Sequence, residues 1–212
     1  MPLRILSAPL LRHKLNLLRD KNTPPEILRS MVEDLTLMAM PYIAEEFPVK
    51  EGRVKTPMGE DSFKFIKEES LLFVCILRAG IPMLNASLRA FPRAKAGFLA
   101  IRRDEKNLKP KLYYKRLPEL KNKWVIILDP MLATGGSLSM AVEEVKPQKP
   151  DRILSFNLVA SPQGLERLVS LHPEVEFFVI SVDKELNQKG YIVPGVGDIG
   201  DRLFTEYPSY TL

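Results

Sequence analysis

Residues 125–137 read VIILDPMLATGGS, an apolar run that ends in Asp129 and enters a Thr-Gly-Gly-Ser turn. The spacing of apolar residues after the turn is typical of a helix over 136–146. A strand, a tight turn and a helix in this order predict an α/β unit, and ligands gather at the carboxyl ends of strands in such units. The stretch therefore indicates both a class of fold and the position of a binding site.

The Thr-Gly-Gly-Ser turn has the groups that a phosphate needs. Gly135 and Gly136 let a phosphate approach the peptide N–H groups, and Thr134 and Ser137 add hydroxyl donors. The following helix offers unpaired N–H groups and a partial positive charge. Asp129 is placed to accept hydrogen bonds from ribose hydroxyls. The turn alone is equally compatible with an ordinary βα connection, but the whole string favours a 5′-phosphate site. It is not a Walker loop, because no Gly-Lys-Ser/Thr follows the glycines.

Apolar runs of strand length lie on both sides of this stretch. Because they are apolar on both faces, they predict strands of a covered parallel sheet over 71–77, 97–101, 124–129, 153–160 and 175–183. Helical spacing between them predicts helices over 81–91, 136–146 and 163–171. Two amphipathic helices precede them over 10–19 and 25–40, with Thr23 as the expected N-cap of the second. This alternation predicts an α/β fold with a doubly wound parallel sheet and N-terminal helices.

Length and composition set limits on the whole chain. Its 212 residues, 45% of them hydrophobic, suit one domain over 1–212. The net charge of +5 suits polyanionic ligands but falls short of the values typical of nucleic-acid-binding proteins, so we do not expect a nucleic-acid partner. Cys75, the single cysteine, predicts a buried thiol and not a nucleophile, because it lies in an apolar run. With no stretch of about 18 apolar residues and no secretory signal pattern, we expect a cytoplasmic protein without a membrane partner.

Three further segments lie next to the predicted strands. ILRAGIPM (76–83) places Arg78, with its planar guanidinium, directly after a strand. GYIVPGVGDIGDRLF (190–204) contains four glycines and a proline, so we expect a shaped backbone loop. The basic segment 104–122 is interrupted by two prolines and predicts a projecting hairpin or mobile loop.

Together these strings resemble the uracil phosphoribosyltransferases, a branch of the type I phosphoribosyltransferases. VIILDPMLATGGS is similar to the family motif that binds phosphoribosyl pyrophosphate (PRPP), and the Asp129-Pro130 pair resembles the uracil branch. The resemblance spans nearly the whole chain, since HKLNLLRDKNT (13–23), RRDEKNLKP (102–110) and LVASPQGLERL (158–168) also look like that family. It implies a type I phosphoribosyltransferase-like fold in which 104–122 forms a flexible hood and 190–204 the uracil-binding loop.

The resemblance also implies roles for individual residues. It assigns catalysis to Arg78, Asp129 and Asp198. The residues implied to bind PRPP are Arg78, Arg103, Asp129, Pro130, Met131, Leu132, Ala133, Thr134, Gly135, Gly136, Ser137 and Asp198. Those implied to bind uracil are Ile192, Gly197, Asp198 and Ile199. Lys106, Lys109 and Lys111 would assist from the hood, and a cis peptide bond is expected next to Arg78.

The implied reaction joins uracil to PRPP and yields UMP and diphosphate in pyrimidine salvage. Mg²⁺ is the implied cofactor, held mainly through PRPP and not by dedicated protein ligands. The resemblance implies a homodimer or homotetramer. Activation by GTP and inhibition by CTP both stay open, because the ending after Arg202 departs from the usual Phe-Gly-Thr and Ile199 replaces a commoner alanine.

Two alternatives are compatible with parts of the sequence. A phosphoribosyltransferase for a purine base would share the phosphate turn, but the Asp-Pro pair and the YIVPGVGD string argue against it. A regulator with the same fold would bind RNA and sense uridine nucleotides, and it would need a contiguous basic face. The basic residues visible in the sequence cluster mostly in 104–122, so the enzyme is favoured.

Overall fold

The computed structural model describes residues 3–103 and 110–205, except for the side chain of Arg103. Within these residues an eight-stranded sheet has the order β1-β10-β9-β7-β4-β5-β6, and β8 pairs with β9 beside this path. Its strands are β1 (Leu3–Ile5), β4 (Leu71–Leu77), β5 (Lys95–Arg103), β6 (Pro110–Arg116), β7 (Trp124–Leu128), β8 (Met131–Leu132), β9 (Arg152–Ala160) and β10 (Val175–Val182). Every pairing is parallel except that of β5 with β6, so the predicted parallel α/β sheet is confirmed.

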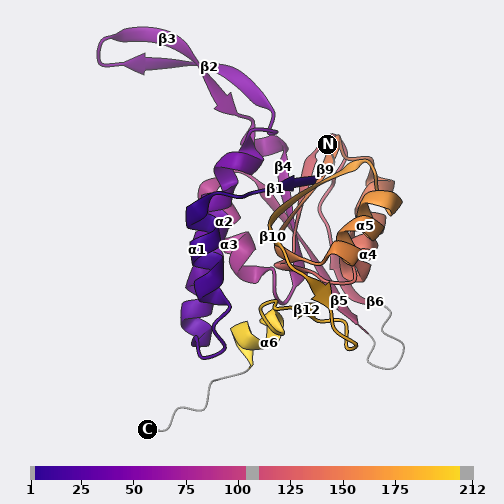
Figure 1. Cartoon of the computed structure of the whole chain (residues 1–212). Helices are drawn as coiled ribbons and strands as arrows, with labels where there is room; N and C mark the ends of the chain where they lie inside the picture. Colours follow the sequence, from indigo (N-terminus) through magenta and orange to yellow (C-terminus); the bar gives the residue numbers. More distant parts are fainter. Residues whose placement is uncertain (1–2, 104–109, 206–212) are drawn as a thin grey trace.

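Helices cover both faces of the sheet (Figure 1). They are α1 (Pro9–Leu18), α2 (Pro25–Ala44), α3 (Ile81–Ala90), α4 (Gly136–Val145), α5 (Pro162–Leu171) and α6 (Ile199–Phe204). The alternation of side chains along a strand explains the two layers. In β4, Leu71, Phe73 and Cys75 join the core under α1, α2 and α3, whereas Leu72, Val74 and Ile76 join the core under α4 and α5. Cys75 is a buried free thiol, as predicted.

The predicted strands and helices are confirmed in type and approximate extent, but one capping prediction was wrong. Helix α2 begins after Pro24, which occupies the N-cap position, and no side chain caps its first turn. Thr23 therefore does not serve as the N-cap. Pro25 at the first helical position needs no N–H partner, so the helix can begin without a capping side chain.

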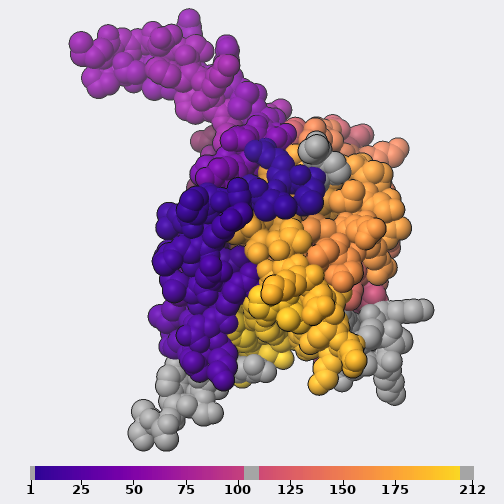
Figure 2. Space-filling view, viewed as in Figure 1, coloured from indigo at the N-terminus to yellow at the C-terminus, as the bar shows by residue number. Residues whose placement is uncertain are grey.

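A long hairpin was not predicted from the sequence. Strands β2 (Val49–Thr56) and β3 (Gly59–Ile66) pair only with each other within the described residues, in an antiparallel two-stranded sheet. This arm projects away from the rest of the chain (Figures 1 and 2). A second two-stranded sheet pairs β11 (Glu185–Leu186) with β12 (Ile192–Val193).

Candidate functional site

Two of the predicted loops follow neighbouring strands. We call residues 129–137 the phosphate loop and residues 78–80 the pyrophosphate loop. Strands β7 and β4 are parallel neighbours in which Leu128 lies opposite Cys75. Both loops therefore leave the sheet at the carboxyl ends of its strands. A side chain at Gly80 would meet the carbonyl oxygens of Leu128 and Ile76. Glycine at this position therefore allows the pyrophosphate loop to pack directly against the strand that carries Asp129.

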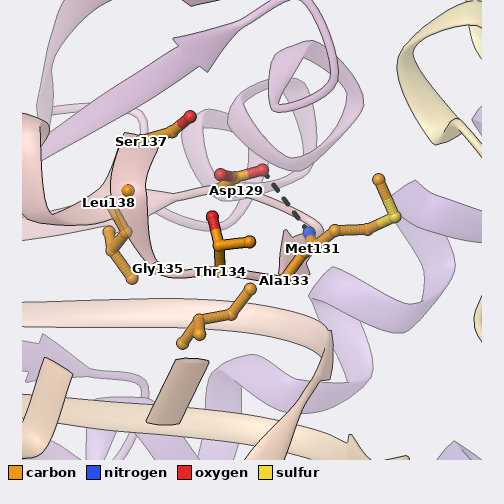
Figure 3. A pocket seen from close by; sticks show the side chains of 9 residues that line it. Asp129, Met131, Ala133, Thr134, Gly135, Ser137 and Leu138 are labelled. Atoms are coloured by element: carbon orange, nitrogen blue, oxygen red, sulfur yellow. Dashed lines mark hydrogen bonds between the residues drawn. The ribbon is translucent and has the colours of Figure 1, made fainter. Parts of the chain in front are cut away.

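The phosphate loop surrounds a small pocket of about 70 Å³. Figure 3 shows the side chains of Asp129, Thr134 and Ser137 around it. Gly135 is the N-cap of α4 and has a φ of +75°, a conformation that favours glycine. The first N–H groups of α4 have no partner within the helix and lie beside this pocket. Backbone N–H groups, two hydroxyls and the positive end of a helix can together hold a phosphate.

Strand β9 and helix α5, the next strand–helix unit along the chain, support the phosphate loop. Asn157 Nδ2 donates a hydrogen bond of 2.7 Å to the carbonyl oxygen of Asp129. Ser161 Oγ donates one of 2.6 Å to the carbonyl oxygen of Ala133 and accepts one from Gly164 N–H. A Cβ at Gly164 would collide with the Ala133 carbonyl, so glycine is required for this close approach. Sequence reasoning missed these supports, although the Ser161-Pro162 pair is a recognisable start of a helix.

Asp129 is a buried carboxyl group. It is 9% exposed, and Oδ1 accepts a hydrogen bond of 3.4 Å from Met131 N–H. Burial raises the pKa of Asp129 from 3.8 to about 7, and the bond from Met131 opposes this only in part. Burial and the nearby Asp129 charge raise the pKa of Cys75 to about 12, so this thiol stays protonated. Asp129 is therefore poised to be ionised by a ligand that donates hydrogen bonds to it or brings a cation.

Arg78 lies exposed at the start of the pyrophosphate loop. The peptide bond between Leu77 and Arg78 is cis, which confirms the predicted cis bond. Arg78 Nη2 donates a hydrogen bond of 2.5 Å to Asp201 Oδ1, a carboxylate of α6. This pairing was not predicted from the sequence, because the two residues lie 123 positions apart. It joins the pyrophosphate loop to the third predicted loop.

The third loop, residues 190–201, is called the base loop here. Gly197 and Asp198 are exposed, and Asp198 caps α6 by accepting a hydrogen bond from Asp201 N–H. Ile192 is 6% exposed and Ile199 is fully buried in the apolar core. A ligand can therefore reach Gly197 and Asp198 directly, whereas Ile199 presents no surface in this conformation. The uracil-contacting roles of these four residues stay a prediction.

The segment 104–122 is described only from residue 110 onward. Residues 110–116 form β6, the antiparallel edge strand, and Lys115 pairs with Glu144 of α4 at 2.7 Å. A Cβ at Gly136 would lie 3.4 Å from Pro110 Cδ, which places the start of β6 beside the phosphate loop. Lys111 lies over the Tyr113 ring. The predicted contacts of Lys106, Lys109 and the Arg103 side chain lie outside the described residues, and the hood stays a prediction.

The carboxylates of the site fit a loosely held divalent cation. Within residues 3–103 and 110–205, no group of three or more His, Cys, Asp and Glu side chains could hold a metal ion. Among the described residues, the Asp129 carboxyl lines the pocket and accepts one weak hydrogen bond, and the exposed Asp198 carboxylate accepts one from Asp201 N–H through Oδ1. Mg²⁺ keeps several waters and binds through one or two carboxylates plus substrate phosphates, which matches this donor set.

Comparison with known protein families gives a match over most of the chain. A family model described as uracil phosphoribosyltransferase matches residues 5–205. The uracil phosphoribosyltransferase of Aquifex aeolicus is 46% identical over 199 residues, covering 94% of this chain and 96% of that protein. The one from Enterococcus faecalis is 37% identical over 202 residues, covering 95% of this chain and 97% of that protein.

Solved structures resemble this one to different degrees. A structure from Aquifex aeolicus has a TM-score of 0.94 at 45% identity and covers 98% of this chain and 100% of that chain. A hypoxanthine phosphoribosyltransferase from Staphylococcus aureus has a TM-score of 0.50 at 11% identity, covering 74% of this chain and 76% of that chain. The second likeness concerns the fold alone. No helix among the described residues is both long and apolar enough to cross a membrane.

Proposed function

The chain belongs to the uracil phosphoribosyltransferase family, and on this premise we propose that it joins uracil to PRPP, forming UMP and releasing diphosphate. Its fold is that of a type I phosphoribosyltransferase. The observation that carries the proposal is the convergence of three loops: the phosphate loop packs beside the pyrophosphate loop, and Arg78 joins the pyrophosphate loop to the base loop. Phosphate, pyrophosphate and base would thus bind in one continuous site.

The proposed reaction is a displacement at the anomeric carbon of ribose. A bond forms between that carbon and N1 of uracil, the bond to the pyrophosphate oxygen breaks with its electron pair leaving on diphosphate, and N1 releases its proton to water. Positive charge spreads over the anomeric carbon and the ring oxygen in the transition state. The α4 N-terminus would hold the 5′-phosphate, and Asp129 would accept the ribose hydroxyls. Catalysis would then consist mainly of positioning and charge stabilisation.

Arg78 is proposed to bind the leaving pyrophosphate. One of its nitrogens pairs with Asp201, and the guanidinium has further donors for phosphate oxygens. Asp129 and Asp198 are the carboxylates that would help the substrate phosphates to hold Mg²⁺, which when bound would supply charge neutralisation for the leaving group. The β5–β6 hairpin lies beside the phosphate loop, and as a hood over the donor it would exclude water.

Uracil is proposed to bind along the base loop. Its two carbonyl oxygens and N3–H can be read by backbone groups in a rigid loop, with Gly197 and Asp198 offering the exposed ones. Cytosine places an amino donor where uracil has an acceptor, so the backbone groups that a bound base covers would lose their hydrogen-bond partners. The enzyme is favoured over the RNA-binding regulator, because the matched family and relatives are named as enzymes.

The test is an assay of UMP formation. Wild type receives PRPP and Mg²⁺ with uracil, cytosine, hypoxanthine or adenine in parallel. Asp129→Asn is the test variant, and Asp151→Asn is its control. Asp151 is exposed and lies just before β9, at the end of the sheet away from the phosphate loop. Turnover with uracil alone, lost in Asp129→Asn and kept in Asp151→Asn, is the expected result. No turnover with any base, combined with salt-dependent RNA binding, would support the regulator instead.

The oligomeric state is proposed to be a dimer or a dimer of dimers. The β2–β3 arm exposes Val49, Phe63 and Phe65 by 43% or more, and a two-stranded ribbon alone is marginally stable. Lysines, arginines and carboxylates all occur on the arm, so two copies can pair without net repulsion. Sedimentation should show a dimer that the double variant Phe63→Ser/Phe65→Ser dissociates. An unchanged mass of the variant would show that the arm is not the interface.

A GTP or CTP effector and a cytoplasmic location stay predictions from the sequence.

A further inference from the structure

A buried ion pair joins the end of helix α1 to the segment before the base loop. Arg19 Nη1 donates to Asp183 Oδ2 and Arg19 Nη2 donates to Asp183 Oδ1, each at 2.7 Å. The Arg19 side chain is 19% exposed and that of Asp183 is 4% exposed. Such a two-bond pair fixes orientation as well as distance. Arg19 and Asp183 therefore form a stiff link between segments 164 positions apart in the sequence.

Both members of this pair hold Gly195 in the base loop. Gly195 N–H donates to Asp183 Oδ2 at 2.8 Å, and the Gly195 carbonyl accepts from Arg19 Nη1 at 2.7 Å. Ser181 Oγ adds a bond of 2.9 Å to Asp183 Oδ1. Burial alone would raise the pKa of Asp183, but hydrogen bonds from Arg19, Gly195 and Ser181 lower it overall. The carboxylate thus stays charged and fixes the Gly195 N–H, while Arg19 fixes the Gly195 carbonyl.

Gly195 lies against the backbone of Ile192, a predicted uracil contact. Gly195 has a φ of +63°, and a Cβ there would collide with the carbonyl oxygen of Ile192. The turn is therefore folded as closely onto Ile192 as a glycine allows. A displacement of Gly195 would move the backbone groups on both sides of this turn.

A second arginine holds the next residue of the loop to the same end of α1. Arg202 Nη1 donates to the carbonyl oxygens of Val196 and Leu18, at 2.6 and 3.3 Å. Arg202 Nη2 donates to the carbonyl oxygen of Asp20 at 2.5 Å. Gly195 and Val196, two successive residues of the base loop, are thus both held to the segment that ends α1.

We infer that Arg19, Asp183 and Arg202 are positioning residues that determine how well the base loop recognises uracil. This inference rests on the proposed function, because it takes the base loop to be the uracil site. A base read by backbone groups is recognised only while the backbone stays within a few tenths of an ångström of its binding shape. The three side chains act through the loop and belong to none of the contacts that support the phosphate loop. Their loss should weaken uracil binding more than PRPP binding, since the phosphate loop keeps its own supports.

The experiment compares Arg19→Met, which keeps the apolar stem, and Arg19→Lys, which keeps the charge. Arg12→Met is the control, because Arg12 is an exposed arginine of the same helix. Loss of the buried charge pair in Arg19→Met should raise the KM for uracil by about tenfold. Arg19→Lys should raise it by about threefold, since one nitrogen cannot replace the two-bond fork. The KM for PRPP should rise less than that for uracil in both variants, because the phosphate loop has its own supports and only Asp198 and Asp201 of the base loop are proposed to act on the donor.

A second measurement on the same variants needs no substrate. Hydrogen exchange at the Gly195 amide, which is bonded to Asp183, should be faster in Arg19→Met than in wild type and unchanged in Arg12→Met. Unchanged exchange, or equal increases of both KM values, would overturn the inference. If wild type makes no UMP while exchange still responds to Arg19→Met, the proposed function fails and the link between α1 and the base loop stands. Should Arg19→Met not fold, Arg19→Lys carries both measurements.

Discussion

The phosphate loop and the base loop lie at the same edge of the sheet but are held in different ways. The phosphate loop rests on Asn157 and Ser161, in the next strand–helix unit along the chain and 28 positions from their partners. The base loop is held by Arg19, whose bonds span 164 and 176 positions. The phosphate loop is therefore supported from the neighbouring strand–helix unit, β9 and α5. The base loop requires the N-terminal helix α1 to be docked as well.

The largest effect is expected from Asp129→Asn in the phosphate loop. The amide keeps the shape of the side chain but cannot accept hydrogen bonds as a charged group or attract a cation. We expect kcat/KM for PRPP to fall by about 10²–10³-fold, the size of effect seen when one charge-stabilising group is lost. Steady-state kinetics with varied PRPP measures this, and Asp151→Asn is the control. A loss below about tenfold would mean that Asp129 does not contact the donor.

The same carboxyl group should give the unliganded protein an unusual pH dependence. Asp129 has its pKa raised from 3.8 to about 7, so between these values the folded chain keeps a proton that the unfolded chain has released. The stabilisation of the folded state by the protonated Asp129 carboxyl is complete below pH 3.8 and is lost as the pH rises through about 7. Such a shift corresponds to about 4 kcal/mol, an order-of-magnitude value.

Thermal unfolding of wild type and Asp129→Asn at several pH values measures this contribution. The variant has no titrating group at this position, so its stability relative to wild type should increase from pH 4 to pH 7 and then level off. A stability difference that is flat across this range would show that Asp129 is ionised in the free protein. Other groups titrate equally in both proteins and cancel in the comparison.

A smaller effect is expected when the support of the phosphate loop is disturbed. Gly164→Ala places a methyl group against the Ala133 carbonyl, so the loop or α5 must shift. We expect the free energy of unfolding to fall by about 2 kcal/mol. The KM for PRPP should rise by about tenfold because the loop is misplaced, with that for uracil nearly unchanged. Gln163→Ala, an exposed neighbour on α5, is the control. Equal changes in both KM values would contradict the separate support of the two loops.

The smallest effect is expected at the contact between the loops. Asp201→Asn removes the carboxylate that orients Arg78, and this pair is about half exposed, so the interaction is weak. We expect the KM for PRPP to rise by about two- to fivefold. Product inhibition by diphosphate should weaken by a similar factor. An increase in the affinity for diphosphate would show that Asp201 competes with the ligand for Arg78 instead of orienting it.

Much of the fold could be predicted from residues that are close in the sequence. Apolar runs such as 71–77 and 153–160 became strands β4 and β9, because each run alone carries the pattern of a strand buried on both faces. The phosphate loop was recognisable for the same reason, since Asp129, Thr134 and the two glycines lie in one string. The β2–β3 arm was missed because its strands are polar and exposed, without an apolar run to mark them.

The sequence by itself determined the alternation of five core strands with helices, the parallel sheet and the glycine turn at the start of α4, because these depend on local periodicity and local backbone preference. Only the tertiary structure decided that Arg19 and Asp183 hold Gly195, that Arg78 pairs with Asp201, and that Gly164 lies against Ala133. Contacts between segments far apart in the chain leave no periodic pattern in either segment. They exist only once the sheet brings those segments together.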